Sequence, residues 1–233
     1  MATTYLIIVS VLALAIGIPL LLKFKNLKLL KTVTSLKRGT KSERKLILTL
    51  LENGTPSQAI FHDLILEKRN GKTSQIDLVV PTKEGIIVFE VKDYSGWIFG
   101  NCTHTRWTQV LAYGNVKHRF YNPVKQNANH ISALKNQSIQ FKNIPYFSII
   151  VFYGDSEIKE IDYVPNGTFL VKPTRIIEVL NLIKKQNKPA AYTDKKEIVR
   201  VLKNAVKIGE NVENQEKHIE NINDTLGKDR IFE

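Results

Sequence analysis

The chain has 233 residues, of which 43% are hydrophobic and 24% are charged, values close to the average for globular proteins. These values exclude a wholly disordered chain, a collagen-like repeat and a multi-span membrane protein, and they leave room for one α/β domain of ordinary size. Cys102 is the single cysteine, which excludes an intramolecular disulfide framework and a cysteine-rich zinc site. The formal net charge of +12 indicates a polyanionic partner, either nucleic acid or an anionic membrane face.

An uncharged run near the N-terminus predicts a single transmembrane helix over residues 5–22. As a helix these residues would span about 27 Å, close to the hydrocarbon thickness of a bilayer. A cleaved signal peptide would carry positive charge before the run, whereas the lysines here follow it, and a buried core helix would carry a polar stripe. The positive-inside rule then places the rest of the chain in the cytoplasm, which suits the unpaired Cys102.

Charge is distributed unevenly along the remaining chain. Residues 23–45 contain nine Lys or Arg and one acid, Glu43, whereas residues 209–233 contain seven acids and three bases. We therefore predict a basic juxtamembrane linker over residues 23–36, which can also rest on anionic lipid headgroups, and an acidic polar tail over residues 208–233.

The hydrophobic pattern between these segments predicts a mixed α/β sheet domain over residues 37–207. Thr40 and Glu43 have capping-box spacing at the start of the first helix. Residues 97–121 are predicted to be rich in loops and carry several aromatic residues. These either stack on unpaired bases or, as we prefer, cover the edge of the core. The predicted elements are, in order, a helix at 40–52, a strand at 59–66, a hairpin of strands at 74–80 and 86–92, a loop-rich stretch at 97–121, a helix at 123–141, strands at 146–153 and 167–171, and helices at 173–185 and 193–206.

The predicted hairpin brings charged residues together. A turn centred on Lys83 and Glu84 pairs residues whose numbers sum to 167, so Asp77 faces Glu90, and Lys92 shares the face of Glu90. Both faces of the hairpin are otherwise apolar, which predicts central strands. The residues predicted on the face opposite the charged groups are Ile76, Leu78, Val80, Ile87, Phe89 and Val91.

Two interpretations of this charged group remain open. The carboxylates and the lysine could form a buried ion-pair cluster, or the carboxylates could bind Mg²⁺ or Mn²⁺ while Lys92 contacts a phosphate or a water. Glu43 lies on the core-facing stripe of its helix, where it could also be only a capping-box residue. Gln126 and His130 lie at i and i+4 on one face of the helix that follows.

Taken together, these residues resemble the nuclease-related domain (NERD) family, which belongs to the PD-(D/E)xK nuclease superfamily. The resemblance covers residues 35–153 and implies a restriction-endonuclease-like mixed sheet flanked by helices and Mg²⁺-dependent cleavage of nucleic acid. It implies that Asp77, Glu90 and Glu43 are metal ligands, that Lys92 is the catalytic lysine and that Gln126 is a further catalytic residue. Ile76 stands where other members have proline. The residues that carry the resemblance are Gly39, Glu43, Ser74, Gln75, Ile76, Asp77, Gly85, Ile86, Phe89, Glu90, Val91, Lys92, Tyr94, Gly96, Trp107, Asn122, Pro123, Val124, Gln126 and His130.

Three functions follow from the sequence. The first is a membrane-anchored nuclease that uses Mg²⁺ (or Mn²⁺) to hydrolyse phosphodiester bonds on the cytoplasmic side, with DNA favoured over RNA as substrate. The second is a module that binds nucleic acid without turnover, and the third is a scaffold on the membrane surface. A complete set of two acids and a lysine favours the first, since a binder of polyanions has no need of buried carboxylates.

Overall fold

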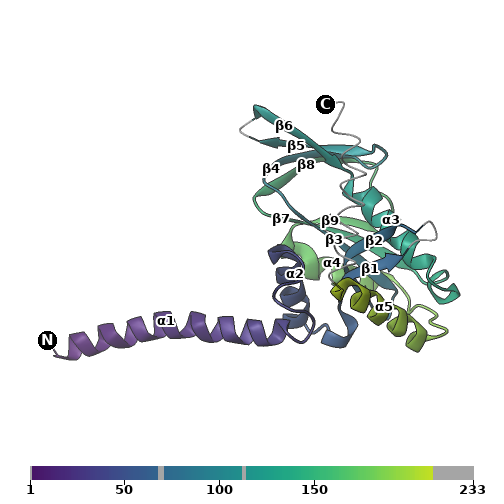
Figure 1. The fold of residues 1–233 in the computed structure, drawn as a ribbon. Helices are drawn as coiled ribbons and strands as arrows, with labels where there is room; N and C mark the ends of the chain where they lie inside the picture. Colours follow the sequence, from purple (N-terminus) through teal and green to yellow (C-terminus); the bar gives the residue numbers. More distant parts are fainter. Residues whose placement is uncertain (1, 68–70, 112–113, 212–233) are drawn as a thin grey trace.

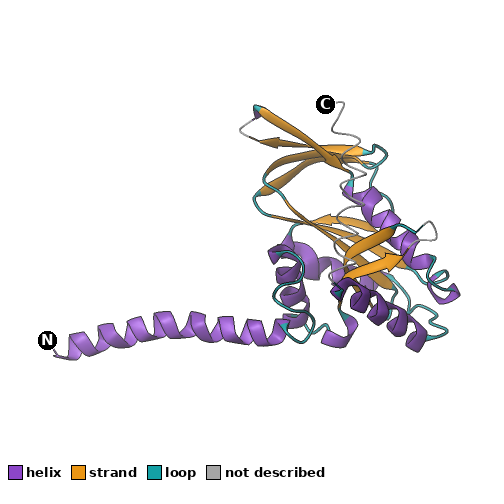
Figure 2. Cartoon of the chain, in the orientation of Figure 1, coloured by secondary structure: helices purple, strands orange, loops and turns teal. Residues whose placement is uncertain are grey.

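The computed structural model describes residues 2–67, 71–111 and 114–211, which form two β-sheets and their covering helices (Figure 1). Figure 2 shows the two sheets as separate groups of strands, with helices gathered around the larger one. The elements are α1 (Ala2–Leu30), α2 (Lys41–Glu52), η1 (Ser57–Ala59), β1 (Phe61–Glu67), β2 (Thr73–Pro81), β3 (Ile86–Asp93), β4 (Gly96–Asn101), β5 (Arg106–Leu111), β6 (Val116–Tyr121), α3 (Pro123–Lys135), η3 (Ile139–Phe141), β7 (Tyr146–Tyr153), β8 (Ser156–Asp162), β9 (Thr168–Val171), η4 (Pro173–Arg175), α4 (Ile176–Gln186) and α5 (Lys195–Glu210).

The larger sheet has the strand order β1-β2-β3-β7-β9. Strands β1, β2 and β3 are antiparallel, whereas β3, β7 and β9 run parallel. Helices α2 and α4 pack on one face through residues such as Leu46 and Ile176, and α3 and α5 pack on the other through residues such as Leu134 and Leu202. The predicted fold class, a mixed sheet flanked by helices, is confirmed.

The register of the central hairpin agrees with the prediction over its turn-proximal half. Leu78 pairs with Phe89 and Val79 with Val88, so the residue numbers sum to 167. The predicted position of Ile76 is wrong, because it packs in the cluster of Val79 and Val88 rather than in that of Leu78. Asp63 lies within β1 and has a left-handed φ of 55°. It interrupts the alternation of side chains along β1 and along the paired part of β2, so residues before and after it follow opposite patterns of inward and outward positions.

The smaller sheet has the order β6-β5-β4-β8, and it corrects the prediction of a loop-rich stretch at 97–121. Three of its strands lie in that stretch, and β8 follows β7 directly. Its inner face packs on the larger sheet, where Trp107 stacks on Phe152 with ring centroids 6.4 Å apart. Cys102 is buried in the same cluster. Apolar residues on both faces of β4 and charged residues along β6 hide the period-2 pattern of strands.

Helix α1 includes the predicted membrane segment and continues through the first half of the predicted linker, to Leu30. Figure 1 shows it extending away from the rest of the molecule, and Tyr5, Ile16 and Leu21 along it are 69–72% exposed. Leu30 at its end is 4% exposed and packs with α2. No helix in the described part of the chain is long and apolar enough to cross a membrane, so the predicted transmembrane helix over residues 5–22 is not supported by the structure.

Two helix ends differ from the predicted ones. Helix α3 ends at Lys135 rather than near residue 141, where the separate turn η3 lies. Helix α5 continues to Glu210, so its last turn includes the first residues of the predicted acidic tail. Residues 212–233 of that tail lie outside the described residues.

Candidate functional site

The charged side chains of β3 form a tight pair at the centre of the larger sheet. Glu90 is 1% exposed, and its Oε1 lies 2.6 Å from Nζ of Lys92, which reaches it along the same strand. Burial alone would raise the pKa of Glu90, but His130 and Lys92 hold the pKa below its ordinary value. Burial likewise opposes the charge on Lys92, but Glu90 raises the pKa of the ammonium. Both groups are therefore charged at neutral pH.

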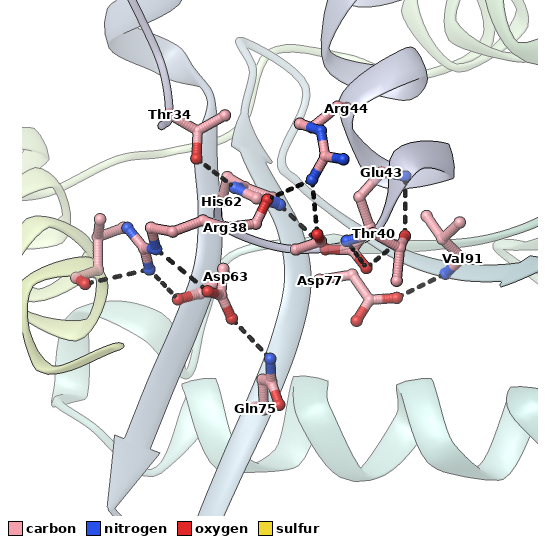
Figure 3. Close-up of polar contacts among 12 residues, drawn as sticks. Thr34, Arg38, Thr40, Glu43, Arg44, His62, Asp63, Gln75, Asp77 and Val91 are labelled. Carbon is pink, nitrogen blue, oxygen red and sulfur yellow. Dashed lines mark hydrogen bonds and ion pairs between the residues drawn. The ribbon is translucent and has the colours of Figure 1, made fainter. Parts of the chain in front are cut away.

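Asp77 reaches the same place from β2. Its Oδ2 accepts a hydrogen bond of 2.7 Å from the backbone N–H of Val91, the residue between Glu90 and Lys92 (Figure 3). Burial raises the pKa of Asp77 well above its ordinary value, and the negative charges of Glu90 and Glu43 raise it further. A carboxyl group in such a negative field is stabilised when it binds a proton, and its charged form is stabilised when a cation binds beside it.

Helix α3 supplies two further side chains. Asn122 caps the helix, because its Oδ1 accepts hydrogen bonds from the backbone N–H groups of Val124 and Lys125. This cap fixes the start of α3. One turn into the helix, Oε1 of Gln126 accepts a hydrogen bond of 3.0 Å from Nζ of Lys92. Gln126 and His130 therefore lie on one face, as predicted, and that face is turned toward β3.

His130 connects Glu90 to β2. Its Nε2 lies 3.2 Å from Oε2 of Glu90, and its Nδ1 lies 2.9 Å from Oγ of Ser74. Neither Glu90 Oε2 nor His130 Nε2 completes a hydrogen bond of good geometry, although both atoms are buried. The i, i+4 spacing predicted His130 beside Gln126, whereas no pattern in the sequence indicated Ser74 as its partner.

Glu43 has the capping role that the spacing predicted. The backbone N–H of Thr40 and its hydroxyl both donate to Oε1 of Glu43, and the N–H of Glu43 bonds the Thr40 hydroxyl, which completes a capping box. Oε2 lies 3.0 Å from Nε2 of His62 (Figure 3). Burial opposes the charge on Glu43, but the hydrogen bond from His62 lowers its pKa. Both carboxylate oxygens are therefore engaged.

Three residues beside the site were not predicted as site residues, namely Arg38, His62 and Asp63. His62 is 1% exposed and joins Glu43 to Thr34, whose hydroxyl lies 2.8 Å from Nδ1. Arg38 pairs with Asp63 at 3.1 Å, and Gln75 donates to the other oxygen of Asp63 at 2.6 Å. The spacing of residues in the sequence does not predict these contacts, because each joins segments that only the folded sheet brings together.

The donor set suits a hard cation held by two carboxylates. Mg²⁺ takes oxygen ligands, usually one or two carboxylates with water and phosphate in the remaining positions, and Asp77 and Glu90 fit this pattern. The predicted three-carboxylate set is not formed. Within residues 2–67, 71–111 and 114–211, no three His, Cys, Asp or Glu side chains lie close enough together to hold a metal ion. Glu43 instead contributes negative charge from its capping position.

The fold and the site thus define a mixed α/β domain that carries two acids and a lysine on its central hairpin. Residues 38–153 match the model of the nuclease-related domain, NERD. This segment is therefore a nuclease-related domain, and the resemblance predicted from the sequence is confirmed.

The comparison with curated proteins also finds a relative of this segment. An uncharacterized protein of Bacillus anthracis is 32% identical over 123 residues, which cover 52% of this chain and 56% of that protein. The chain thus matches little more than half the length of this relative. No solved structure matches the chain.

Proposed function

We propose that the domain is a Mg²⁺-dependent nuclease that hydrolyses phosphodiester bonds of nucleic acid. The observation that carries the proposal is the pair of carboxylates from adjacent strands, Asp77 and Glu90, with Lys92 beside them. The raised pKa of Asp77 supports it, because its neighbours keep this carboxyl group from ionising, and a bound divalent cation would stabilise the ionised form. Membership of the nuclease-related family supports the same class of reaction.

Each side chain has a role that follows from its contacts. Asp77 and Glu90 would hold Mg²⁺, which when bound supplies a nucleophilic hydroxide and stabilises the leaving oxygen. Lys92 is charged and places its ammonium beside the carboxylates, where it can orient the scissile phosphate. Gln126 fixes that ammonium through the bond of Oε1 with Nζ. His130 and Ser74 restrain Glu90 from the opposite side.

A binding module without turnover is the second candidate. The ion pair of Glu90 with Lys92 favours it, since a buried pair of this kind can be purely structural. The two candidates differ at Asp77, because a structural cluster of Glu90, Lys92 and His130 has no use for a second carboxylate whose ionisation is disfavoured.

A cleavage assay of the full chain tests the proposal. Duplex DNA, single-stranded DNA and RNA are incubated with Mg²⁺ or Mn²⁺, and the wild type is compared with Asp77→Asn. The matched control is Asp155→Asn, which changes an exposed carboxylate in the turn between β7 and β8. We expect metal-dependent cleavage by the wild type and the control, and a loss of roughly a hundredfold or more in Asp77→Asn. Binding without cleavage in any metal would support the second candidate instead.

Membrane location is a separate part of the proposal. It rests on the uncharged run at residues 5–22 and on the lysines that follow it, which would face the cytoplasm. Fractionation of cells that express the full chain, with an alkaline carbonate wash, tests it. Recovery in the soluble fraction would retire the membrane part and leave the nuclease proposal untouched.

A further inference from the structure

The outer face of the smaller sheet has a regular arrangement of aromatic and basic side chains. The strand register places residues side by side in two rows across β4, β5 and β6. Residues paired across strands project from the same face, so the two rows form one surface. The rows are Trp97–Val110–Lys117 and Phe99–Thr108–Arg119. Together they line an open hollow of about 900 Å³.

This face is distinct from the one that builds the core. The other face of the sheet presents Ile98, Trp107 and Phe120 to the larger sheet, and they form a buried cluster with Phe152. Trp97 and Phe99 are only half-buried and do not belong to the core clusters of the described residues. Packing therefore does not explain why two aromatic residues alternate along β4.

We propose that this outer face binds single-stranded nucleic acid, an inference that rests on the proposed nuclease function and names its substrate class. Aromatic rings on an open sheet stack on unpaired bases, whereas the bases of a duplex are stacked on one another and do not present their faces. The exposed Lys117 and Arg119 lie on the edge strand β6, where they can contact phosphates.

The two edge strands of this sheet differ in charge, and this difference determines where the phosphates of a bound strand lie. Glu157 and Glu160 on β8 continue the same two rows at the opposite edge of the sheet. Lys159, which pairs with Glu157 at 2.6 Å, lies over the Trp97 ring at 5.3 Å from its centroid. Phosphates are thus favoured along β6 over β8, where two glutamates outnumber Lys159, with the aromatic rings of β4 between the two edges.

The chain connects this face to the carboxylates at both of its ends. Trp97 follows Lys92 by five residues, because β3 leads directly into β4. Tyr121 at the end of β6 precedes Gln126 by five residues on α3. Tyr94 packs on Phe120 with ring centroids 4.8 Å apart, between the two sheets. The smaller sheet is therefore joined to the site residues at both ends by five residues, which span at most about 17 Å when extended.

Binding of a labelled oligothymidylate to the full chain, measured in EDTA so that no cleavage occurs, tests the proposal. The first variant is Lys117→Gln with Arg119→Gln, and its matched control is Lys184→Gln with Lys185→Gln on α4. We expect the first variant to bind roughly tenfold more weakly and the slope of log affinity against log salt to fall by about 1.4, since each phosphate contact contributes about 0.7 on single strands. The control should retain wild-type affinity.

A second variant, Trp97→Leu, separates stacking from charge. It should weaken oligothymidylate binding by roughly fivefold or more while the salt slope stays unchanged. Full affinity in both variants, an equal loss in the α4 control, or tighter wild-type binding to duplex than to single strand would each overturn the proposal.

Hydrolysis of bis(p-nitrophenyl) phosphate tests the proposed function separately, because a diester of this size bound at the carboxylates cannot also contact the outer face. Both outer-face variants should hydrolyse it at the wild-type rate in Mn²⁺. Absence of hydrolysis by the wild type would count against the nuclease, whereas the EDTA binding data would still decide whether the outer face holds a single strand.

Discussion

Asp77 and Glu90 come from adjacent strands of one hairpin, yet their surroundings shift their pKa values in opposite directions. Glu90 has two partners that favour its charge, Lys92 and His130, whereas the hydrogen bond of Asp77 comes from a backbone amide. The charge of Glu90 is therefore already compensated, whereas Asp77 is kept from ionising and would take up its negative charge only when a cation binds beside it. The ion-pair interpretation makes Asp77 a partner of Lys92, and Lys92 does lower the pKa of Asp77, but by less than burial and the two glutamates raise it.

The first prediction concerns Asp77→Asn without metal. The carboxyl group titrates near 3.8 in the unfolded chain and at higher pH in the folded protein. As the pH rises above about 4, the unfolded chain releases this proton first, so the wild type loses stability until the folded pKa is passed. The variant has no such proton and should be more stable at pH 8 by on the order of 1–2 kcal/mol. The gain should shrink toward pH 4, which urea unfolding at several pH values will measure.

Thermal melts of the same two proteins with and without Mg²⁺ provide the complementary result. Millimolar Mg²⁺ should raise the melting temperature of the wild type, because the metal binds the folded state, and it should leave Asp77→Asn unchanged. A variant that is less stable than the wild type at pH 8, beside a wild type that does not respond to Mg²⁺, would contradict the assignment of Asp77 as a ligand.

The second prediction compares two Glu–Lys pairs with the same distance of 2.6 Å. Glu90 and Lys92 are 1% and 17% exposed, whereas Glu157 and Lys159 are 60% and 37% exposed. Glu90→Gln leaves a buried ammonium without its charge partner and should cost roughly 3–5 kcal/mol in the free energy of unfolding. Glu157→Gln should cost less than about 1 kcal/mol, because water screens the exposed pair. Equal costs in guanidinium unfolding would show that Lys92 is solvated or paired elsewhere.

At the scale of elements, the entry to α2 sets the position of Glu43. Gly39 has a φ of 61°, and a Cβ there would lie 2.4 Å from Oε2 of Glu43 and 2.5 Å from Nε2 of His62. The glycine therefore allows the capping carboxylate and the imidazole to meet. Glu43 in turn adds to the field that raises the pKa of Asp77, so the geometry of this helix start affects the site.

The third prediction is Gly39→Ala, with Gly54→Ala as its control. Both glycines have positive φ, but a Cβ at Gly54 would meet no atom within 4 Å. The control should lose about 1 kcal/mol of stability from backbone strain alone, whereas Gly39→Ala should lose roughly 2–4 kcal/mol because it also displaces Glu43 or His62. Thermal melts of the two variants measure the difference. Similar losses would mean that the Glu43–His62 contact can move without cost.

The same elements show how far the sequence alone could lead. The capping box of α2 and the central hairpin were predictable, because each depends on local spacing: Thr40 with Glu43, and a short glycine-containing turn between two apolar runs. The smaller sheet was not, since its strands carry apolar residues on both faces or charges along an edge. The contacts of His62, Asp63 and Ser74 join residues 12 to 56 positions apart, which no local pattern records.

At the scale of the whole molecule, the N-terminal helix divides into two parts. In its first two thirds Ile16 and Leu21 are 69% and 71% exposed, whereas Leu30 is 4% exposed and belongs to the same core cluster as Leu46 and Leu50 of α2. The folded body thus begins before residue 31, earlier than the predicted start of the domain at residue 37. The end of α1 is part of the core even though the rest of it projects outward (Figure 1).

The fourth prediction follows from that division. A fragment of residues 23–233 should unfold cooperatively, because the described side chains that it removes, such as Ile16 and Leu21, are exposed. Leu30→Ala within this fragment should cost roughly 2–4 kcal/mol, since it empties a packed position in the core. Leu36→Ala, at a side chain that is 42% exposed, is the matched control and should change stability by less than about 0.5 kcal/mol. Circular dichroism melts measure all three proteins. A fragment that fails to melt cooperatively would show that the folded body needs part of residues 1–22, against the exposure of side chains such as Ile16 and Leu21.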